Sequence, residues 1–149
     1  MYKRQERIQG FLDTIASNAN YQVINRADCD GQIEIAMPTM KQMLKETPAV
    51  DVVMALNDRS ALGALAAIES MEIDNVLVYG VDGSPDVKEL INTGLIQATA
   101  AQSPVKMGQL AYQKAKALLE NKKIEKKIEV PVELISRDNI SNFELTGWQ

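Results

Sequence analysis

Three short apolar runs stand in the middle of the chain, and each is followed directly by polar residues. The runs cover residues 50–56, 75–81 and 95–101, and the polar residues after them are Asn57-Asp58, Asp82-Gly83-Ser84 and Gln102-Ser103. Apolar runs of this length, separated by helical patterns, are typical of buried parallel strands. Ligands of such sheets bind just beyond the carboxyl ends of the strands. The pattern therefore predicts one polar, hydrogen-bonding pocket for a small polyhydroxy ligand.

Helical patterns separate these runs. Apolar positions with helical spacing predict helices over residues 5–17 and 32–45, and Pro38 inside the second should kink or break it. Capping signals predict three further helices, which cover about residues 57–71, 84–94 and 103–121. Weaker β patterns lie at residues 21–25, near 128–134 and around Phe143. This alternation predicts an α/β domain in which helices cover both faces of a parallel sheet.

The composition excludes several classes of function. The chain of 149 residues is long enough for one domain with a core, and its net charge of −4 gives no sign of a nucleic-acid surface. It has no histidine and one cysteine, Cys29, which excludes the usual nucleophile–base pairs, most zinc sites and an internal disulfide. We therefore expect no catalytic residue, no metal site and no cofactor, so that the chain is not an enzyme.

The sequence carries no sign of a membrane span or a signal peptide. No stretch approaches the roughly 20 apolar residues that cross a bilayer. The first residues, Met1 to Gln5, lead directly into a helical pattern rather than into a charged start and an apolar core.

The polar strand ends and their surroundings resemble a known family. The segments that carry the likeness are Asn57–Ala64, Val78–Gly83 and Ala100–Pro104, together with Arg7–Phe11 near the start and Glu129–Ile135 near the end. In this order and spacing they resemble the type I periplasmic sugar-binding proteins of ABC importers, most of all the ribose-, allose- and galactose-binding group. The likeness covers nearly the whole chain, but only about the second half of the family's fold.

The resemblance implies a division of the chain. Residues 1–102 would form the second, C-terminal ligand-binding lobe without its first strand. Residues 103–127 would carry a helix that belongs to the first lobe, and residues 128–149 a crossover strand and the C-terminal tail. The apolar face of the helix from Ser103 to Asn121 would then be exposed in this chain, so we expect aggregation, self-association or poor sugar binding.

Carried over by position, Arg7, Asn57, Asp82 and Gln102 resemble ligand-contacting residues of the second lobe. The chemistry suits a sugar, because a hydroxyl both donates and accepts: a carboxylate accepts, an arginine donates, and an amide does both. Plainer interpretations stay open for each residue. Asn57 and Asp82 occur where a helix cap or a turn is expected, Gln102 is followed by a linker-like Ser-Pro, and Arg7 fits a solvent-facing helix position.

One residue departs from the family pattern. The family often places an aromatic side chain after its second strand here, to stack on the sugar, and the matching position is Cys29, between Asp28 and Asp30. A thiol offers neither a broad face nor a strong hydrogen bond. This departure puts ribose-like specificity in doubt and indicates a different or larger ligand.

The resemblance implies the solute-binding component of a carbohydrate ABC import system in a bacterium, either periplasmic or anchored at the cell surface. Its partners would be a sugar and a membrane permease, with no nucleic acid bound by this segment. The alternative is the effector-binding domain of a lac-repressor-type transcription regulator, which would be cytoplasmic. A sensor domain fused to a kinase or chemoreceptor is a third interpretation.

Overall fold

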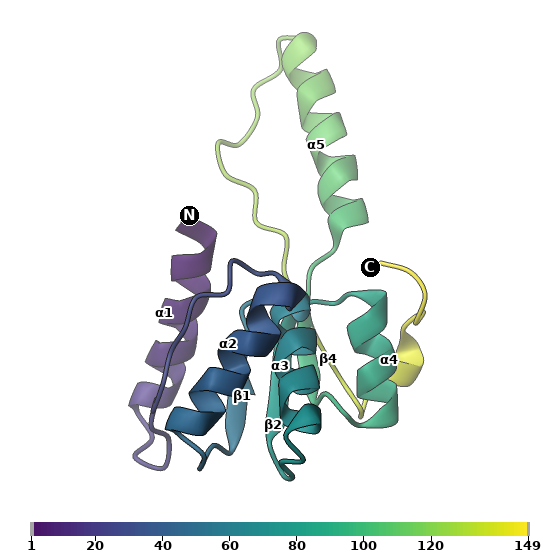
Figure 1. The fold of residues 1–149 in the computed structure, drawn as a ribbon. Coiled ribbons are helices and arrows are strands. Elements are labelled where there is room, and N and C mark those ends of the chain that lie inside the picture. The colour runs from purple at the N-terminus through teal and green to yellow at the C-terminus, as the bar shows by residue number, and fades with distance from the viewer. Residues whose placement is uncertain (1, 149) are drawn as a thin grey trace. The chain divides into compact units, whose positions relative to one another are not determined.

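The structure is a computed structural model that describes residues 2–148. It divides into two compact units, Met1–Gly80 and Val81–Gln149. The elements, in chain order, are α1 (Tyr2–Ala16), α2 (Ile33–Glu46), β1 (Val52–Met54), α3 (Asp58–Ser70), β2 (Leu77–Asp82), α4 (Pro85–Thr93), β3 (Ala98–Ala101), α5 (Pro104–Leu119), β4 (Glu133–Ser136) and the 3₁₀ helix η1 (Ile140–Asn142). The five predicted helices and the three central strands are confirmed (Figure 1).

In the first unit, a parallel strand pair accompanies two closely packed helices. Strand β1 pairs with β2 in the register Val52↔Leu77, Val53↔Val78 and Met54↔Tyr79. Helices α2 and α3 lie against each other at small residues (Figure 1). A Cβ at Gly63 would lie only 2.6 Å from that of Ala36 and 2.9 Å from the carbonyl oxygen of Ile33. The Gly63 position therefore has no room for a larger side chain.

Helix α2 continues through Pro38, so of the kink or break expected there, the break does not occur. Proline lacks an N–H and therefore removes one intrahelical hydrogen bond, at a typical cost of about 3 kcal/mol. The apolar face of this helix is buried, with Ala36 at 4%, Met40 at 6% and Leu44 at 2% exposure. Burial of this face against the unit favours the helical conformation on both sides of the proline.

The strand predicted at residues 21–25 is wrong, because this segment has no regular structure. Its apolar side chains are exposed, Tyr21 by 57% and Ile24 by 45%. A strand forms only where a neighbouring strand satisfies its backbone groups. Within residues 2–148, no strand pairs with this segment. The alternation of its residues could not show whether a partner strand is present.

In the second unit, strand β3 is followed by an antiparallel neighbour. Strand β4 pairs with β3 from Ala98↔Ser136 to Ala101↔Glu133. The strands of the sheet follow the order β1-β2-β3-β4, and β2 contributes residues to both units. The predicted α/β class with a mainly parallel sheet is confirmed, and only the last strand, β4, which returns after a long connection, runs antiparallel to its neighbour.

The C-terminal region differs from the prediction in detail. The expected β segment near residues 128–134 forms a strand only from Glu133 to Ser136. No strand forms around Phe143, where the short η1 helix, Ile140–Asn142, precedes an irregular tail. Ile140 is 6% exposed, so its burial, rather than a β pattern, organises this region.

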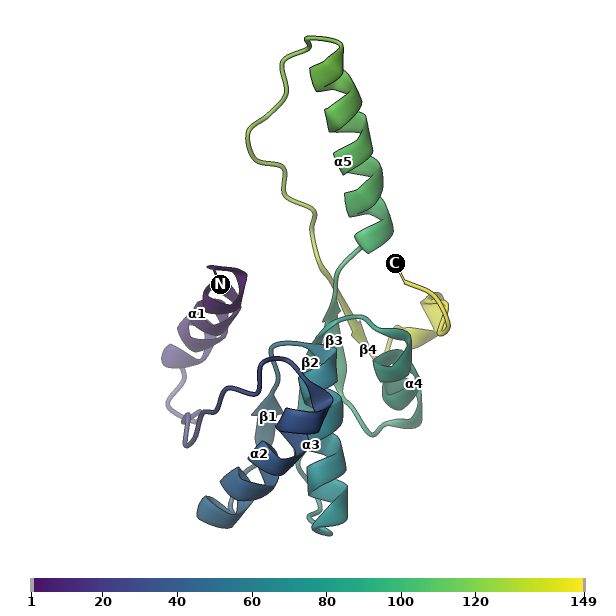
Figure 2. The same cartoon turned by 45° about the horizontal axis from the view of Figure 1, so that its top comes forward.

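Helix α5 is amphipathic but has no buried residue. Figures 1 and 2 show α5 and the returning segment 120–132 extending from the rest of the second unit. The large apolar side chains exposed on it include Val105 (55%), Met107 (39%), Leu118 (56%) and Leu119 (86%). The expectation that this face is exposed in the chain is confirmed.

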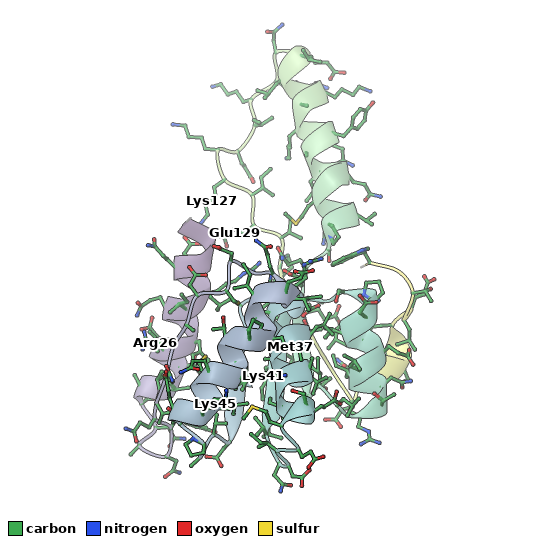
Figure 3. All side chains as sticks on the ribbon, viewed as in Figure 1. Arg26, Met37, Lys41, Lys45, Lys127 and Glu129 are labelled. Carbon is green, nitrogen blue, oxygen red and sulfur yellow. The ribbon has the colours of Figure 1, made fainter. Side chains whose placement is uncertain are left out.

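The returning segment is rich in charged residues and largely open to solvent. Lys127 and Glu129, both labelled in Figure 3, form an ion pair with 2.6 Å between Nζ and Oε1, and this contact lowers the pKa of Glu129. Both side chains are exposed by more than 70%, so the pair contributes little to stability. No helix within residues 2–148 combines the length and the apolar character needed to cross a bilayer.

Candidate functional site

Asn57 lies at the end of β1 and caps helix α3. Its Oδ1 accepts a hydrogen bond from the backbone N–H of Ser60 at 2.9 Å, and its Nδ2 donates to the carbonyl of Gly31 at 3.1 Å. An asparagine amide has two N–H donors and an oxygen with two lone pairs. The capping interpretation is thus confirmed. The same side chain also ties the loop before α2 to the start of α3.

Arg7 of α1 lies next to this cap. Its Nη1 donates to the backbone carbonyl of Leu56, the residue before Asn57, at 2.7 Å. The contact joins residues 49 positions apart in the sequence, and the side chain is half-buried. Arg7 is therefore not a solvent-facing helix charge, and the structure brings its guanidinium to the end of β1.

Cys29 also lies beside the start of α3. Its Sγ is 3.2 Å from Oγ of Ser60, and Ser60 is the residue whose N–H the Asn57 side chain caps. The thiol is half-buried. Arg7, Cys29 and Asn57 thus gather around the N-terminus of α3 within the first unit.

Two residues of this region, Gly31 and Asp58, make close contacts that the sequence patterns did not indicate. Gly31 has a φ of +69°, and a Cβ there would lie 2.7 Å from Nδ2 of Asn57, so only glycine suits the position. Asp58 is 1% exposed, and a Cβ on Gly80 of β2 would lie only 2.4 Å from its Oδ1. A glycine in a strand often marks a place where another group comes close to the backbone. Gly80 carried this signal in the sequence, but the signal does not say that Asp58 is the neighbouring group.

In the second unit, Asp82 and Gln102 form a hydrogen-bonded pair. Nε2 of Gln102 donates to Oδ1 of Asp82 at 2.6 Å, and the backbone N–H of Gln102 donates to the Asp82 carbonyl at 3.0 Å. The two residues lie at the ends of β2 and β3, where the sequence placed them. The main-chain bond and the side-chain bond together orient the carboxylate and the amide.

Asp82 has an unusual backbone conformation. Its φ is +130°, which is rare for a residue with a side chain and typically costs about 1–3 kcal/mol. The next residue, Gly83, has a φ of +79° and donates its N–H to Oγ1 of the buried Thr99 at 3.2 Å. Strain of this kind persists where the surroundings over-determine the conformation, and it is concentrated at functional sites.

The first unit supplies a guanidinium that donates and an amide that does both, and the second unit supplies a carboxylate that accepts and a further amide. Among residues 2–148, no group of three or more acidic or cysteine side chains is placed to hold a metal ion. Each of these side chains can pair with a hydroxyl group, which both donates and accepts.

Comparison with known proteins shows the family. The model of the family described as "Periplasmic binding protein domain" matches residues 3–123, and the chain therefore belongs to this family. It is similar to the ribose import binding protein RbsB of Bacillus subtilis strain 168, with 35% identity over 130 residues, which are 87% of this chain and 42% of that protein.

The RbsB protein of Escherichia coli strain K12 is 32% identical over 131 residues, which are 88% of this chain and 44% of that protein. Among solved structures, the fold is similar to that of an ABC transporter periplasmic solute binding protein from Actinobacillus succinogenes 130z with bound D-allose. The TM-score is 0.90 at 25% identity, over 93% of this chain and 50% of that one. The chain thus spans less than half the length of these two curated relatives.

Proposed function

We propose that this chain is part of the solute-binding component of a bacterial carbohydrate ABC importer. In this proposal Arg7, Cys29, Asn57, Asp82 and Gln102 contact a sugar, and no reaction is catalysed. The relatives named above are binding proteins for ribose or a solute-binding protein with D-allose, which supports a sugar as the ligand.

The observation that carries the proposal is the Asp82–Gln102 pair on a strained backbone. A carboxylate held at a fixed angle by a neighbouring amide needs little further ordering when a sugar hydroxyl donates to it. A hydrogen bond to a charged group contributes about 1.5–3 kcal/mol. A sugar with one hydroxyl misplaced leaves such a group without its bond, and this provides specificity.

The remaining residues have graded roles in the proposal. Arg7 donates to sugar oxygens while its bond to Leu56 holds it in place. Asn57 contributes the N–H donor and the oxygen lone pair that its bonds to Gly31 and Ser60 leave unused. Cys29 borders the ligand without an aromatic face, and this favours a ligand other than ribose.

The test is calorimetric titration of the polypeptide as its own gene encodes it, with a panel of pentoses, hexoses and cyclitols. Asp82→Ala should abolish binding of the sugar that binds the wild type, while the circular dichroism spectrum stays unchanged. Asp86→Ala is the matched control, because Asp86 is an exposed carboxylate in the first turn of α4. Unchanged affinity of Asp82→Ala would contradict the site.

The same proposal places the protein outside the cytoplasmic membrane, periplasmic or anchored at the cell surface, with a membrane permease as partner. Fractionation of the source cells and copurification with the permease would test both. Sugar-dependent release of DNA by the native polypeptide, found in the cytoplasm, would instead support the regulator interpretation.

Self-association is the second property proposed for the 149-residue chain. The apolar face of α5, which includes Val105, Leu118 and Leu119, supports this proposal because it is exposed. Exposed apolar patches favour association with another surface. Sedimentation velocity should show oligomers whose fraction falls when Leu118 and Leu119 are both changed to serine. A wild-type chain that stays monomeric at high concentration would contradict it.

A further inference from the structure

Lys88 of helix α4 is a buried lysine with backbone partners. Its side chain has 0% exposure, a rare state for this residue type unless it is paired. The ammonium group donates hydrogen bonds to the carbonyl oxygens of Glu144 and Gly147. Carbonyl acceptors offset part of the large cost of burying a charge. Both of them come from the C-terminal tail, so Lys88 ties that tail to α4.

The tail has two further contacts with the same helix. The short η1 helix packs on α4, and its Ile140 is 6% exposed. At the C-terminal end of α4, a Cβ on Gly94 would lie 3.2 Å from Nη1 of Arg137. A guanidinium near the last carbonyls of a helix is favourable for the helix dipole. Residues 137–148 thus follow α4 from its end to its middle.

The tail ends beside the start of another helix. Trp148 lines a shallow apolar depression of about 380 Å³ together with Pro104 and Val105, the first two residues of α5. Helix α4 begins three residues after Asp82, and α5 begins two residues after Gln102. The same tail therefore contacts both helices that follow the Asp82–Gln102 pair.

We propose that residues 137–148 form a C-terminal strap that holds the turns carrying Asp82 and Gln102 in their binding conformation, with Lys88 as its positioning residue. The link from Lys88 to the pair is short. The backbone N–H of Lys88 donates to the carbonyl of Ser84 at 3.0 Å. Ser84 lies one helical turn before Lys88 and two residues after Asp82. The strained φ of Asp82 requires surroundings that hold it, and the strap supplies part of them.

The effect of the strap on sugar affinity rests on the proposed function, whereas the strap itself rests on the contacts above. The experiment separates the two. Its variant is Lys88→Met, which keeps the length of the side chain and removes the ammonium. The control is Lys45→Met, on an exposed lysine of α2 that is labelled in Figure 3.

The first readout is the fluorescence of Trp148, the single tryptophan of the chain. In Lys88→Met the strap should detach, so acrylamide should quench Trp148 about twofold more effectively than in the wild type or in Lys45→Met, because a detached indole is open to solvent. Equal quenching in all three proteins would overturn the assignment of Lys88 as the tie.

The second readout is amide hydrogen exchange at Gly83 and Gln102, whose N–H groups bond to Thr99 and Asp82. Exchange there should quicken by about tenfold or more in Lys88→Met, while amides of the α2–α3 pair keep their rates. If Trp148 is quenched more strongly in Lys88→Met but exchange at Gly83 and Gln102 is unchanged, the strap does not hold the Asp82 and Gln102 turns, and the positioning role of Lys88 is overturned.

A chain that ends at Asn142 is the second variant, for use if Lys88→Met does not fold. It removes both carbonyl acceptors and leaves Lys88 in place, and it should quicken the same two amides. The third readout is sugar affinity, which should fall about tenfold in either variant. This affinity is measured on the polypeptide as its own gene encodes it. If that polypeptide binds no sugar, the proposed function is overturned, and the exchange rates still decide on the strap.

Discussion

The two groups of candidate residues differ in what their side chains already do. In the first unit, both polar ends of Asn57 are bonded to the backbone, at Ser60 and Gly31. In the second unit, the Asp82 carboxylate is bonded by another side chain, Gln102, on a backbone with a positive φ. Both residues follow a strand and precede a helix, yet the former stabilises local structure and the latter is held in a strained conformation.

The difference teaches how to weigh a polar residue at a strand end. A side chain that satisfies backbone groups contributes to folding, and its loss costs free energy of unfolding. A residue held at a strained backbone angle costs stability, and such strain is concentrated at functional sites. Mutations at the two positions should therefore separate stability from affinity.

The largest effect is expected at Asp82. Asp82→Asn keeps an oxygen that accepts from Gln102, and asparagine occurs at positive φ about as readily as aspartate does, so the free energy of unfolding should change by less than about 0.5 kcal/mol. Sugar affinity should fall about 10- to 100-fold, because a bond to a charged group is replaced by one to a neutral group. Calorimetry and urea unfolding measure the two quantities. If the free energy of unfolding fell by as much as the free energy of sugar binding, Asp82 would not differ from Asn57 in the way proposed.

The next effect is expected at the helix caps. Asn57→Ala removes the cap of α3 and leaves the Gly31 carbonyl without its donor, so the free energy of unfolding should fall by about 1–2 kcal/mol. Ser84→Ala is the matched cap of α4, with a longer bond of 3.4 Å to the N–H of Val87, and it should cost less. Urea unfolding of the two variants decides, and a larger loss at Ser84 would reverse the assigned roles.

A pair of glycines sharpens the stability side of the comparison. Gly31→Ala should lower the free energy of unfolding by about 1 kcal/mol or more, because φ is +69° and the new Cβ meets Asn57. Gly10→Ala in α1 should raise it by about 0.5–1 kcal/mol, since nothing lies within 4 Å and alanine favours the helix. Thermal unfolding of both variants tests this, and shifts of the same sign would count against the close Gly31–Asn57 contact.

The smallest effect concerns pH and Lys88. Burial lowers the pKa of Lys88 below its usual 10.5, and the charge of Glu144 opposes this shift. Between the lowered pKa and 10.5 the unfolded chain binds more protons than the folded one, so the free energy of unfolding gains a contribution that rises with pH.

Lys88→Met should remove this rise. Urea unfolding at several pH values from about 8 to 10 should therefore show the wild type gaining stability relative to the variant. A difference between the two proteins that stays constant across this range would show that the Lys88 ammonium is not desolvated in the folded state.

The sequence patterns located most of the elements, because helix caps and apolar periodicity are local signals. Ser84 with Pro85 and the left-handed Gly94, for example, bound α4 as expected. The errors have non-local causes. Residues 21–25 alternate but have no partner strand among the described residues, and Pro38 is tolerated in a helix whose apolar face is buried.

The candidate residues were predictable only in part. Apolar runs that end in Asn57, Asp82 and Gln102 marked positions beyond strands, and the structure brings Asp82 and Gln102 into contact. Arg7 beside Leu56, Cys29 beside Ser60 and Lys88 beneath the tail join positions far apart in the chain. No periodicity contains such pairings, since they depend on how the elements pack.

By itself, the sequence determined the α/β class, the helix boundaries and the polar residues after each central strand, because these follow from backbone sterics, capping and periodic burial of apolar side chains. Tertiary structure alone decided that Asn57 is bonded to backbone at both ends, that Asp82 is held at positive φ, and that Lys88 is buried under the C-terminal tail. The reason is physical: hydrogen-bond partners and desolvation depend on neighbours in space, which a linear pattern does not specify.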